Sequence, residues 1–349
     1  MKRLLALTLA IVISFGVLST NRTTVQAQKA LKIGVVTDVG KVDDRSFNQS
    51  AWEGAQQGAQ ATGGTADYIE TLSTDDYANN IQQFADKNYD IIITVGFALG
   101  DATTKAAQKY PNIKFLSVDN AAPDGIPNYT GLVFHEDQPG FLVGYLAAKL
   151  SKSKVIGGVY GFAVPAVVNY KEGFELGAKL ADPSVKVIST YYPGGIDKAF
   201  TDPEWGAQTA GQEMDQGADF VFGAGGKTGN GALQEVAKRT TADKPLYCIG
   251  VDVDQWDSLP EAHPCLITSA EKLIVPGIVA LIKQISDGSI KPGKFVGDIA
   301  VAPFHDFDKV VPADLQATLK DLHDQLLAGK IQSLPPATPA ATMAATASK

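Results

Sequence analysis

Short apolar runs alternate with amphipathic stretches along most of this sequence. From Leu31 onward, an apolar run is followed by a turn containing glycine or aspartate and then by a stretch with helical periodicity, and this order repeats. The run Ile91–Val95 is almost continuously apolar, which is typical of a parallel strand covered by helices on both faces of its sheet. The alternation therefore predicts an α/β protein with doubly wound parallel sheets.

The alternating pattern occurs twice. The first series predicts strands at residues 32–37, 66–71, 91–95, 114–118 and 130–134, and helices at 46–62, 75–87 and 99–109. The second series predicts strands at 155–159, 185–190, 220–223, 246–251 and 266–269, and helices at 141–150, 166–180, 205–216 and 231–239. No Gly/Ser-rich or Pro-rich linker separates the two series, so we expect two lobes joined by continuing strands.

The elements expected after residue 269 are too few for a third domain. They are a helix at 275–286, a strand at 297–301 and a helix at 313–328, and we expect them to cross back and complete the two lobes. The expected N-terminal lobe therefore comprises residues 31–134 and 270–301. The expected C-terminal lobe comprises residues 135–269 and 302–332.

The two ends of the chain differ from its body. Residues 1–27 begin with Lys2 and Arg3, continue with an apolar run over residues 4–18 and then turn polar, which is the layout of a signal peptide. That run is shorter than the ~20 residues of a membrane-spanning helix, which favours a cleaved signal peptide. An uncleaved N-terminal anchor is the alternative. Because no cysteine follows the run for lipid attachment, we expect a mature chain that is periplasmic or secreted. Residues 333–349, rich in Pro, Ala, Thr and Ser, are expected to form a disordered tail.

Charge and composition exclude several classes of partner. The chain has 30 basic and 38 acidic residues among 349, and loss of Lys2, Arg3 and Arg22 with the signal peptide changes its net charge from −8 to −11. No stretch concentrates basic residues with interleaved aromatics, so nucleic acid is not an expected partner. The two cysteines, Cys248 and Cys265, belong to no metal-binding motif. In an oxidising compartment they form either one disulfide or two buried thiols.

Carboxylates and aromatic residues recur where the predicted strands end. Asp38, Asp119 and Asp252 each follow a strand, and Phe47 lies at the start of the first helix. Ligands of open α/β sheets bind at the carboxyl ends of strands, so two lobes should share one cleft there. Aspartates with aromatics suit a planar ligand that carries hydroxyl groups, although any one aspartate alone would be read as a helix cap.

A glycine-rich stretch at residues 223–229 needs a separate interpretation. Its Gly226-Lys227-Thr228 order resembles the end of a phosphate-binding loop, but the glycine required five residues earlier is replaced by Val221. We therefore expect close approach of the backbone to a ligand at a helix N-terminus.

The sequence contains no recognisable catalytic motif. His135, His263, His305 and His323 are scattered, and neither a paired-histidine metal motif nor a GxSxG nucleophile is present. A hydrolase that uses carboxylates alone is the remaining enzymatic alternative, since glycoside cleavage needs only two. We expect a binding protein without a metal or cofactor.

Several segments resemble one known family. Residues 37–40 and 43–49, with Trp52 and Gly54, are similar to the signature of the basic membrane protein family of ABC-transporter substrate-binding proteins, the PnrA-like purine nucleoside receptors. The resemblance continues in the same order through further blocks, which are 140–148, 165–173, 200–202, 225–231, 249–252, 254–255, 268–269 and Lys272.

This resemblance implies a fold and a ligand class. The fold is the type I periplasmic-binding-protein fold, with two Rossmann-like lobes and three hinge segments, here expected near Phe134, Ser269 and Ala302. The ligand is a purine nucleoside that a monomeric receptor passes to an ABC permease. An extracellular sensor of the same fold and, more remotely, a nucleoside hydrolase are the alternatives.

The resemblance also assigns roles to individual residues. It implies that Phe47 stacks on the base, that Asp38, Asn48 and Asp119 face the base, that Asp252 and Lys272 hold the ribose, and that Gly226 and Lys227 supply backbone contacts. For the second stacking ring we choose Phe222, with Phe200 as the alternative. The sequence departs from the family at Lys227, where members often run from glycine directly into Thr-Gly, and in the missing lipid-attachment cysteine.

Overall fold

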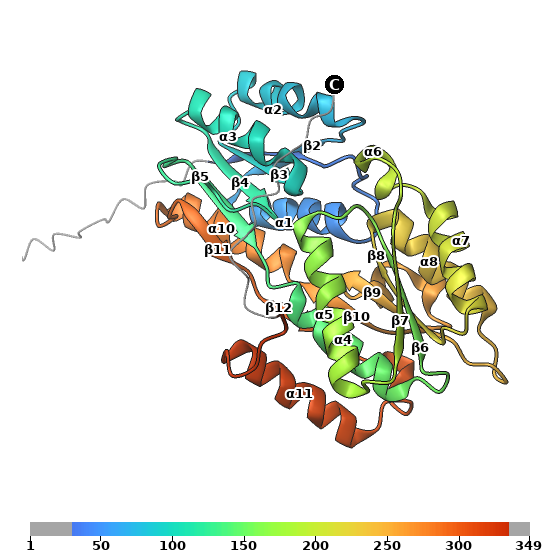
Figure 1. The fold of residues 1–349 in the computed structure, drawn as a ribbon. Coiled ribbons are helices and arrows are strands. Elements are labelled where there is room, and N and C mark those ends of the chain that lie inside the picture. Colours follow the sequence, from blue (N-terminus) through green and yellow to red (C-terminus); the bar gives the residue numbers. More distant parts are fainter. Residues whose placement is uncertain (1–29, 335–349) are drawn as a thin grey trace, which may run out of the picture.

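The computed structural model describes residues 30–334 and consists of two α/β lobes (Figure 1). Within this range the strands form two six-stranded sheets, each with helices on both faces. No helix in the described range is long and apolar enough to cross a membrane. The predicted signal peptide, residues 1–27, and residues 335–349 of the predicted tail lie outside the described residues. The α/β fold with two parallel-sheet lobes is confirmed.

The N-terminal lobe contains the sheet with strand order β11-β5-β4-β3-β1-β2, and neighbouring strands are parallel. Its strands are β1 (Lys32–Val36), β2 (Thr65–Ile69), β3 (Ile91–Val95), β4 (Lys114–Val118), β5 (Tyr129–Val133) and β11 (Gly293–Val296). Alternate side chains of β3 enter different cores because successive strand residues face opposite ways. One face packs against α1 (Phe47–Thr62) and α10 (Ile274–Asp287), and the other against α2 (Tyr77–Asp86) and α3 (Gly100–Lys109).

The C-terminal lobe repeats this plan with the order β12-β10-β9-β8-β6-β7. Its strands are β6 (Val155–Tyr160), β7 (Lys186–Tyr191), β8 (Phe220–Ala224), β9 (Tyr247–Asp252), β10 (Leu266–Lys272) and β12 (Ile299–Val301), of which β12 is antiparallel to β10. One face packs against α4 (Asp137–Leu150), α5 (Pro165–Ala181) and α11 (Ala313–Leu327), and the other against α7 (Pro203–Asp215) and α8 (Gly226–Arg239). Short elements complete this lobe: α6 (Ile196–Ala199), α9 (Gln255–Ser258), and 3-10 turns at Pro260–Ala262 and His305–Phe307.

The chain crosses between the lobes at places that differ from two of the predicted ones. The first crossing follows β5, near Phe134 as predicted. The second follows Lys272 instead of Ser269, because β10 continues through its charged end inside the second sheet. The third lies at residues 297–298, because β11 ends at Val296 in the first sheet and β12, which covers residues 299–301 of the predicted strand 297–301, lies in the second. The expected boundaries 270–301 and 302–332 are therefore wrong by a few residues.

Close packing of α4 on α5 fixes one wall between the lobes. A side chain at Gly144 would collide with the carbonyl oxygen of Phe174, and one at Gly177 with that of Phe141, so the two helices approach each other where both lack a Cβ. This contact holds α5 firmly against the rest of the lobe. The beginning of α5, which points towards the N-terminal lobe, is thereby held in place.

The two cysteines are bonded to each other. The disulfide Cys248–Cys265 joins β9 to the turn that precedes β10, and both residues are completely buried. Of the two alternatives for these cysteines, the structure has the disulfide.

Candidate ligand-binding cleft

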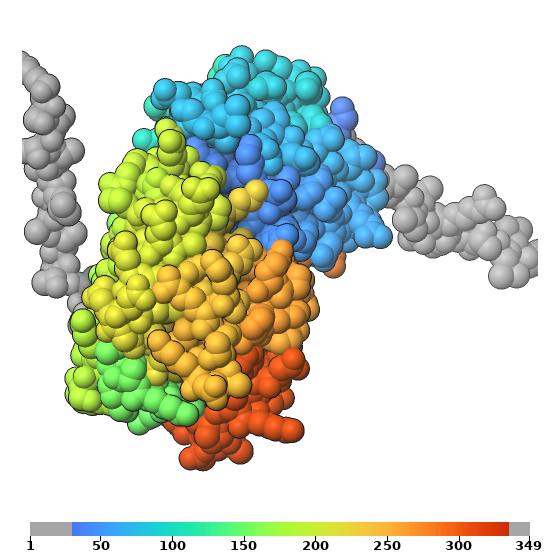
Figure 2. Space-filling model, turned by 90° about the vertical axis from the view of Figure 1, so that its right-hand side faces the viewer, coloured from blue at the N-terminus to red at the C-terminus, as the bar shows by residue number. Residues whose placement is uncertain are grey.

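A cavity lies between the two lobes, with about 670 Å³ of empty space when the part open to solvent is included. In the space-filling view, the blue N-terminal lobe and the yellow and gold segments of the C-terminal lobe are in contact (Figure 2). Both lobes contribute to the wall of the cavity, whose lining residues are Asp38, Val39, Asp44, Phe47, Asn48, Tyr77, Gly96, Phe97, Ala98, Asp119, Val164, Ala166, Val167, Tyr170, Ile196, Phe200, Ala224, Gly225, Gly226, Val251, Asp252 and Lys272.

Asp119 and Asp252 occupy equivalent positions in the two lobes. Asp119 directly follows β4 and Asp252 ends β9, and these strands hold the same place in the order of their sheets. Both residues adopt the left-handed backbone conformation, with φ of 63° and 68°. This conformation is strained for a residue with a side chain, and such strain is often found at functional sites. The sharp turn at each strand end directs a carboxylate into the shared cleft.

Lys272, the last residue of β10, binds both of these carboxylates. Its Nζ lies 2.8 Å from Asp119 Oδ2 and 3.5 Å from Asp252 Oδ1, and its side chain is only 3% exposed. Burial by itself lowers the pKa of Lys272, but the surrounding carboxylates of Asp119, Asp252 and Glu136 outweigh burial and raise it. The ammonium group therefore stays charged, and the cluster joins one lobe to the other.

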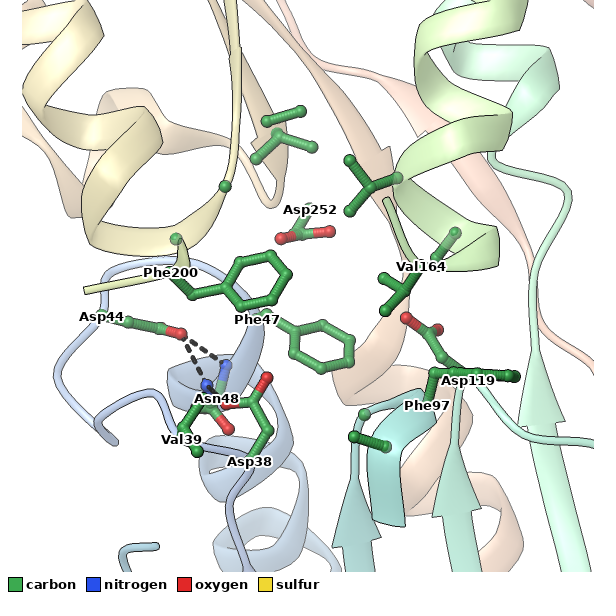
Figure 3. Close-up of a pocket in the computed structure, with 18 of the residues that line it drawn as sticks. Asp38, Val39, Asp44, Phe47, Asn48, Phe97, Asp119, Val164, Phe200 and Asp252 are labelled. Carbon is green, nitrogen blue, oxygen red and sulfur yellow. Dashed lines mark hydrogen bonds between the residues drawn. The ribbon is translucent and has the colours of Figure 1, made fainter. Parts of the chain in front are cut away.

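Two phenylalanine rings from different lobes enter the cavity. Phe47 is the first residue of α1, and Lys272 Nζ lies 4.5 Å from the centre of its ring. Phe200, which follows α6, enters from the C-terminal lobe (Figure 3). A cation near one ring and a second ring nearby produce a surface on which a flat ligand can stack.

The choice of Phe222 as the second ring is wrong. Phe222 is completely buried in the core of the C-terminal lobe, where it packs against the rings of Tyr160, Tyr170 and Phe174. It lies inside β8, and the chain reaches the cleft only at Ala224, the last residue of that strand. Phe200, the alternative, lines the cavity instead.

Gly226 and Lys227 behave differently from each other. Gly226 lines the cavity with φ of 54°, in agreement with close approach of its backbone. Lys227 is not among the lining residues: its backbone N–H donates to the carbonyl oxygen of Phe200, and its ammonium binds Asp43 of the other lobe. The expected backbone contact of Lys227 with a ligand is therefore not supported, because its donor is already used.

The loop before α1 is organised by a buried carboxylate. Asp44 accepts hydrogen bonds from the backbone N–H groups of Ser46, Asn48 and Gln49, as expected for a residue that caps a helix. The side-chain amide of Asn48 donates to Asp44 Oδ2 at 3.0 Å and to Asp38 Oδ1 at 2.9 Å (Figure 3). These bonds fix the orientation of Asn48 and place it beside Asp38 in the cleft.

Burial changes the acidity of several carboxyl groups here. It raises the pKa of Asp38 to about 6, although hydrogen bonds from Asn48 and Gly40 oppose it. Burial, together with the nearby Asp119, also raises the pKa of Glu136, which accepts a hydrogen bond from Asn169, to about 7.

Several lining residues were given no ligand-binding role in the sequence analysis, among them Tyr77, Phe97 and Tyr170. Phe97 follows β3 by two residues and Tyr77 begins α2 after β2, so extending the strand-end argument to the next helix would have included both. Tyr170 lies on the second turn of α5, and no local signal distinguishes it from a core tyrosine. Among the described residues, no group of three or more His, Cys, Asp or Glu side chains could hold a metal ion.

Comparison with known proteins identifies relatives of comparable length. The chain is 33% identical to the ABC transporter nucleoside-binding protein BmpA of Lactococcus lactis over 323 residues, which cover 86% of this chain and 88% of the relative. It is 32% identical to the CD4+ T-cell-stimulating antigen of Listeria monocytogenes over 272 residues, 73% of this chain and 74% of the relative. It is 28% identical to an uncharacterized lipoprotein of Pyrococcus horikoshii, over 76% of this chain and 66% of the relative.

Solved structures and a family model complete the comparison. An ABC transporter solute-binding protein from Aeropyrum pernix has the same fold, with a TM-score of 0.79 and 22% identity over 88% of this chain and 94% of that one. The fold is thus that of the type I periplasmic binding proteins. Residues 31–296 match the family described as ABC transporter substrate-binding protein PnrA-like. The chain therefore belongs to this basic membrane protein family, whose members are substrate-binding proteins of ABC transporters and not enzymes.

Proposed function

We propose that this protein captures a purine nucleoside between its two lobes and delivers it to an ABC permease. The observation that carries the proposal is the combination, in one cavity, of two aromatic rings with the cluster Asp119–Lys272–Asp252. The rings suit a flat base, and the charged cluster suits a sugar with neighbouring hydroxyl groups. The name of the Lactococcus lactis relative, a nucleoside-binding protein, supports the same ligand class.

The charged cluster is the proposed ribose site. Asp119 and Asp252 can accept hydrogen bonds from hydroxyl groups while Lys272 donates one, and charge-assisted bonds of this kind contribute about 1.5 to 3 kcal/mol each. The charged groups of the cluster are already buried and paired with one another. Ligand binding therefore does not require the removal of an unpaired charge from water. The strained backbone of both aspartates holds the acceptors in place before the ligand arrives.

The aromatic rings form the proposed base site. Phe47 belongs to the N-terminal lobe and Phe200 to the C-terminal lobe, so a base stacked between them would contact both lobes at once. Stacking of a base on an aromatic side chain contributes about 1 to 3 kcal/mol. A ligand that joins the lobes in this way favours their closed arrangement.

The electrostatics of the cleft favour a nucleoside over a nucleotide. The lining includes the carboxylates of Asp38, Asp44, Asp119 and Asp252, whereas Lys272 is the single cationic side chain among the described lining residues. A phosphate in this cavity would face like charges, each opposing it by several kcal/mol at an effective dielectric constant of about 20 and about 4 Å separation. We therefore expect a neutral ligand.

The proposed cellular role depends on the N-terminal segment as well. The layout of residues 1–27 supports export and cleavage, after which a monomeric chain would act outside the cytoplasm beside its permease. The relatives include a lipoprotein, so attachment to the membrane is the alternative to a free form. Free and membrane-attached forms can be separated by fractionating cells that produce the full chain.

Calorimetric titration of the chain without residues 1–27 tests the ligand class. We expect guanosine or another purine nucleoside to bind, guanosine monophosphate to bind much more weakly, and ribose or a free base to bind weakly alone. Asp252→Asn should abolish most of the binding, whereas Asp182→Asn, at an exposed ion pair with Lys154, should leave it unchanged. Absence of binding by every nucleoside would overturn the proposal, and release of free base from the nucleoside would replace it with hydrolysis.

A further inference from the structure

One corner of the cavity holds two buried polar groups that lack hydrogen-bond partners among the described residues. Asn48 and Tyr77 both line the cavity and are 2% and 4% exposed, yet Asn48 Oδ1 and the Tyr77 hydroxyl have no hydrogen-bond partner in the described structure. Asp38, which is half-buried, lines the same corner and accepts its hydrogen bonds from Gly40 and Asn48 on Oδ1, so its Oδ2 atom is available to a ligand. Buried polar groups are normally satisfied, so the two exceptions at Asn48 and Tyr77 indicate that a ligand supplies the missing bonds.

The orientation of these groups is fixed by the bonds they do make. Asp38 Oδ1 accepts from Gly40 N at 2.7 Å and from Asn48 Nδ2 at 2.9 Å. Because Asn48 Nδ2 also donates to Asp44, both of its hydrogens are used and only its oxygen remains free. The corner therefore offers two acceptors, Asp38 Oδ2 and Asn48 Oδ1, and one hydroxyl donor from Tyr77.

We propose that Asp38, Asn48 and Tyr77 make this protein selective for 6-oxopurine nucleosides, with guanosine preferred over adenosine. This inference rests on the proposed function, which places the base at this end of the cavity and the ribose at Lys272. The corresponding edge of guanine carries two neighbouring donors, N1–H and the 2-amino group, beside the O6 acceptor. That set complements two acceptors and one donor.

Adenine presents a different edge to the same corner. Its N1 is an acceptor, so its lone pair would face the Asp38 carboxylate, and one buried acceptor of the protein would stay unpaired. An unpaired buried acceptor weakens binding about 5- to 150-fold, and a site built to bind a donor rejects ligands without it. Inosine, which keeps N1–H and O6 but lacks the amino group, should lie between guanosine and adenosine.

The protonation state of Asp38 gives the selectivity a pH dependence. Burial raises the pKa of this carboxyl to about 6, with Asp44 and Asp119 as the nearby acids that raise it further. Below that pH the protonated group can donate to N1 of adenine. The preference for guanosine should therefore be strong at pH 8 and weaker at pH 5.

Titration of guanosine, inosine and adenosine at pH 8 and pH 5 tests the inference. We expect guanosine to bind at least about 10-fold more tightly than adenosine at pH 8, a difference that shrinks at pH 5. Asp38→Asn, whose amide can both donate and accept, should shift the preference towards adenosine and remove its pH dependence. Tyr77→Phe should weaken guanosine and inosine and leave adenosine unchanged, which provides a second variant if Asp38→Asn fails to fold.

The outcomes separate this inference from the proposed function. Equal affinity for guanosine and adenosine at pH 8 would overturn the proposed selectivity. The proposed function as a purine nucleoside receptor would then still stand. If Tyr77→Phe lost affinity for all three nucleosides, Tyr77 would have a structural role. This result would contradict the proposed hydrogen bond from Tyr77 to O6. Failure of the wild type to bind any nucleoside would instead overturn the function itself.

Discussion

Lys227 Nζ lies 2.6 Å from Asp43 Oδ1, and this ion pair joins the two lobes outside the cavity. Two neighbouring contacts also join the lobes. Arg45 pairs with Glu261 at 2.6 Å, and the side chain of Asn230 donates to the carbonyl oxygen of Asp44 at 2.7 Å. The loop at residues 41–46 is thus docked on the C-terminal lobe. Lys227, where the sequence analysis expects a departure from the family, helps to hold the lobes together.

Loss of the Lys227–Asp43 ion pair should lower the affinity for ligand, although neither residue lines the cavity. Exposed ion pairs contribute at most about 1 kcal/mol, so Lys227→Ala should weaken ligand binding only about 2- to 5-fold, mainly through faster dissociation. The dissociation rate, measured by stopped flow at low and high salt, checks this. Lys320→Ala, which breaks an exposed pair within α11, is the matched control and should have no effect. Unchanged dissociation in Lys227→Ala would show that the pair does not contribute to closure.

Alanine substitutions at Phe47, Phe200 and Phe222 should distinguish an effect on ligand binding from an effect on stability. Phe47→Ala and Phe200→Ala should weaken nucleoside binding about 5- to 150-fold, corresponding to the loss of one stacking ring each. Phe222→Ala should instead lower the free energy of unfolding by about 3 to 5 kcal/mol, because it leaves a cavity in a packed core. Titration and urea unfolding of the same three variants distinguish the two effects. A stable Phe222→Ala protein that had lost its affinity would contradict the placement of this ring in the core.

Lys272→Met should destabilise the protein in a pH-dependent manner. The substitution leaves Asp119 and Asp252 buried beside each other without their cation, and breaking a buried pair in this way costs about 3 to 5 kcal/mol. Burial and the nearby carboxylate of Asp252 raise the pKa of the Asp119 carboxyl, and the substitution removes Lys272, which opposes that rise. The loss of stability is therefore expected to be small at pH 5 and to grow as the pH rises to 8. Urea unfolding of variant and wild type at both pH values measures it, and a loss independent of pH would argue against unpaired charge as the cause.

Glu213 should make the wild-type protein less stable at alkaline pH. Burial raises the pKa of this carboxyl to about 8, although Thr190 donates a hydrogen bond to it at 2.9 Å, and its Oε2 atom has no partner in the described structure. Because the folded state holds this proton more tightly than the unfolded state, the contribution to stability is complete below about pH 4.3 and is lost as the pH rises through 8. Melting temperatures between pH 5 and 8.5 should fall less steeply for Glu213→Gln than for the wild type. Parallel curves for the two proteins would contradict this role of Glu213.

Most secondary structure could be predicted because the signal is local. Runs such as Ile91–Val95 showed strands, and the periodicity of residues 46–62 showed a helix that the structure begins at Phe47. Errors arose at glycines and prolines, which disfavour helices in isolation. Helix α8 begins at Gly226 and not at residue 231, and α4 already contains Pro139 and Gly140 in its first turn. Packing against neighbouring elements outweighs those local preferences.

The site could be predicted only in part. The strand-end rule indicated Asp38, Asp119 and Asp252, all of which line the cavity, because the fold class alone fixes the edge where ligands bind. The rule could not distinguish Phe200 from Phe222, since Phe222 lies two residues before the end of β8, in the core, whereas Phe200 follows α6 and not a strand. It also missed Tyr77, which comes several residues after its strand.

The sequence by itself determined the alternation of strands and helices, the family and the positions at which polar residues follow strands, because each depends on neighbouring residues or on motifs in order. The tertiary structure decided that Lys272 would be buried between aspartates from both lobes, that Lys227 would reach Asp43, and that Tyr77 and Asn48 would meet Asp38 in one corner. The first two contacts depend on how the two sheets face each other across three crossings, and the third depends on how α1 and α2 pack around the end of β1. Contacts between residues more than 150 positions apart, as for Lys272 and Asp119, leave no periodicity in the sequence.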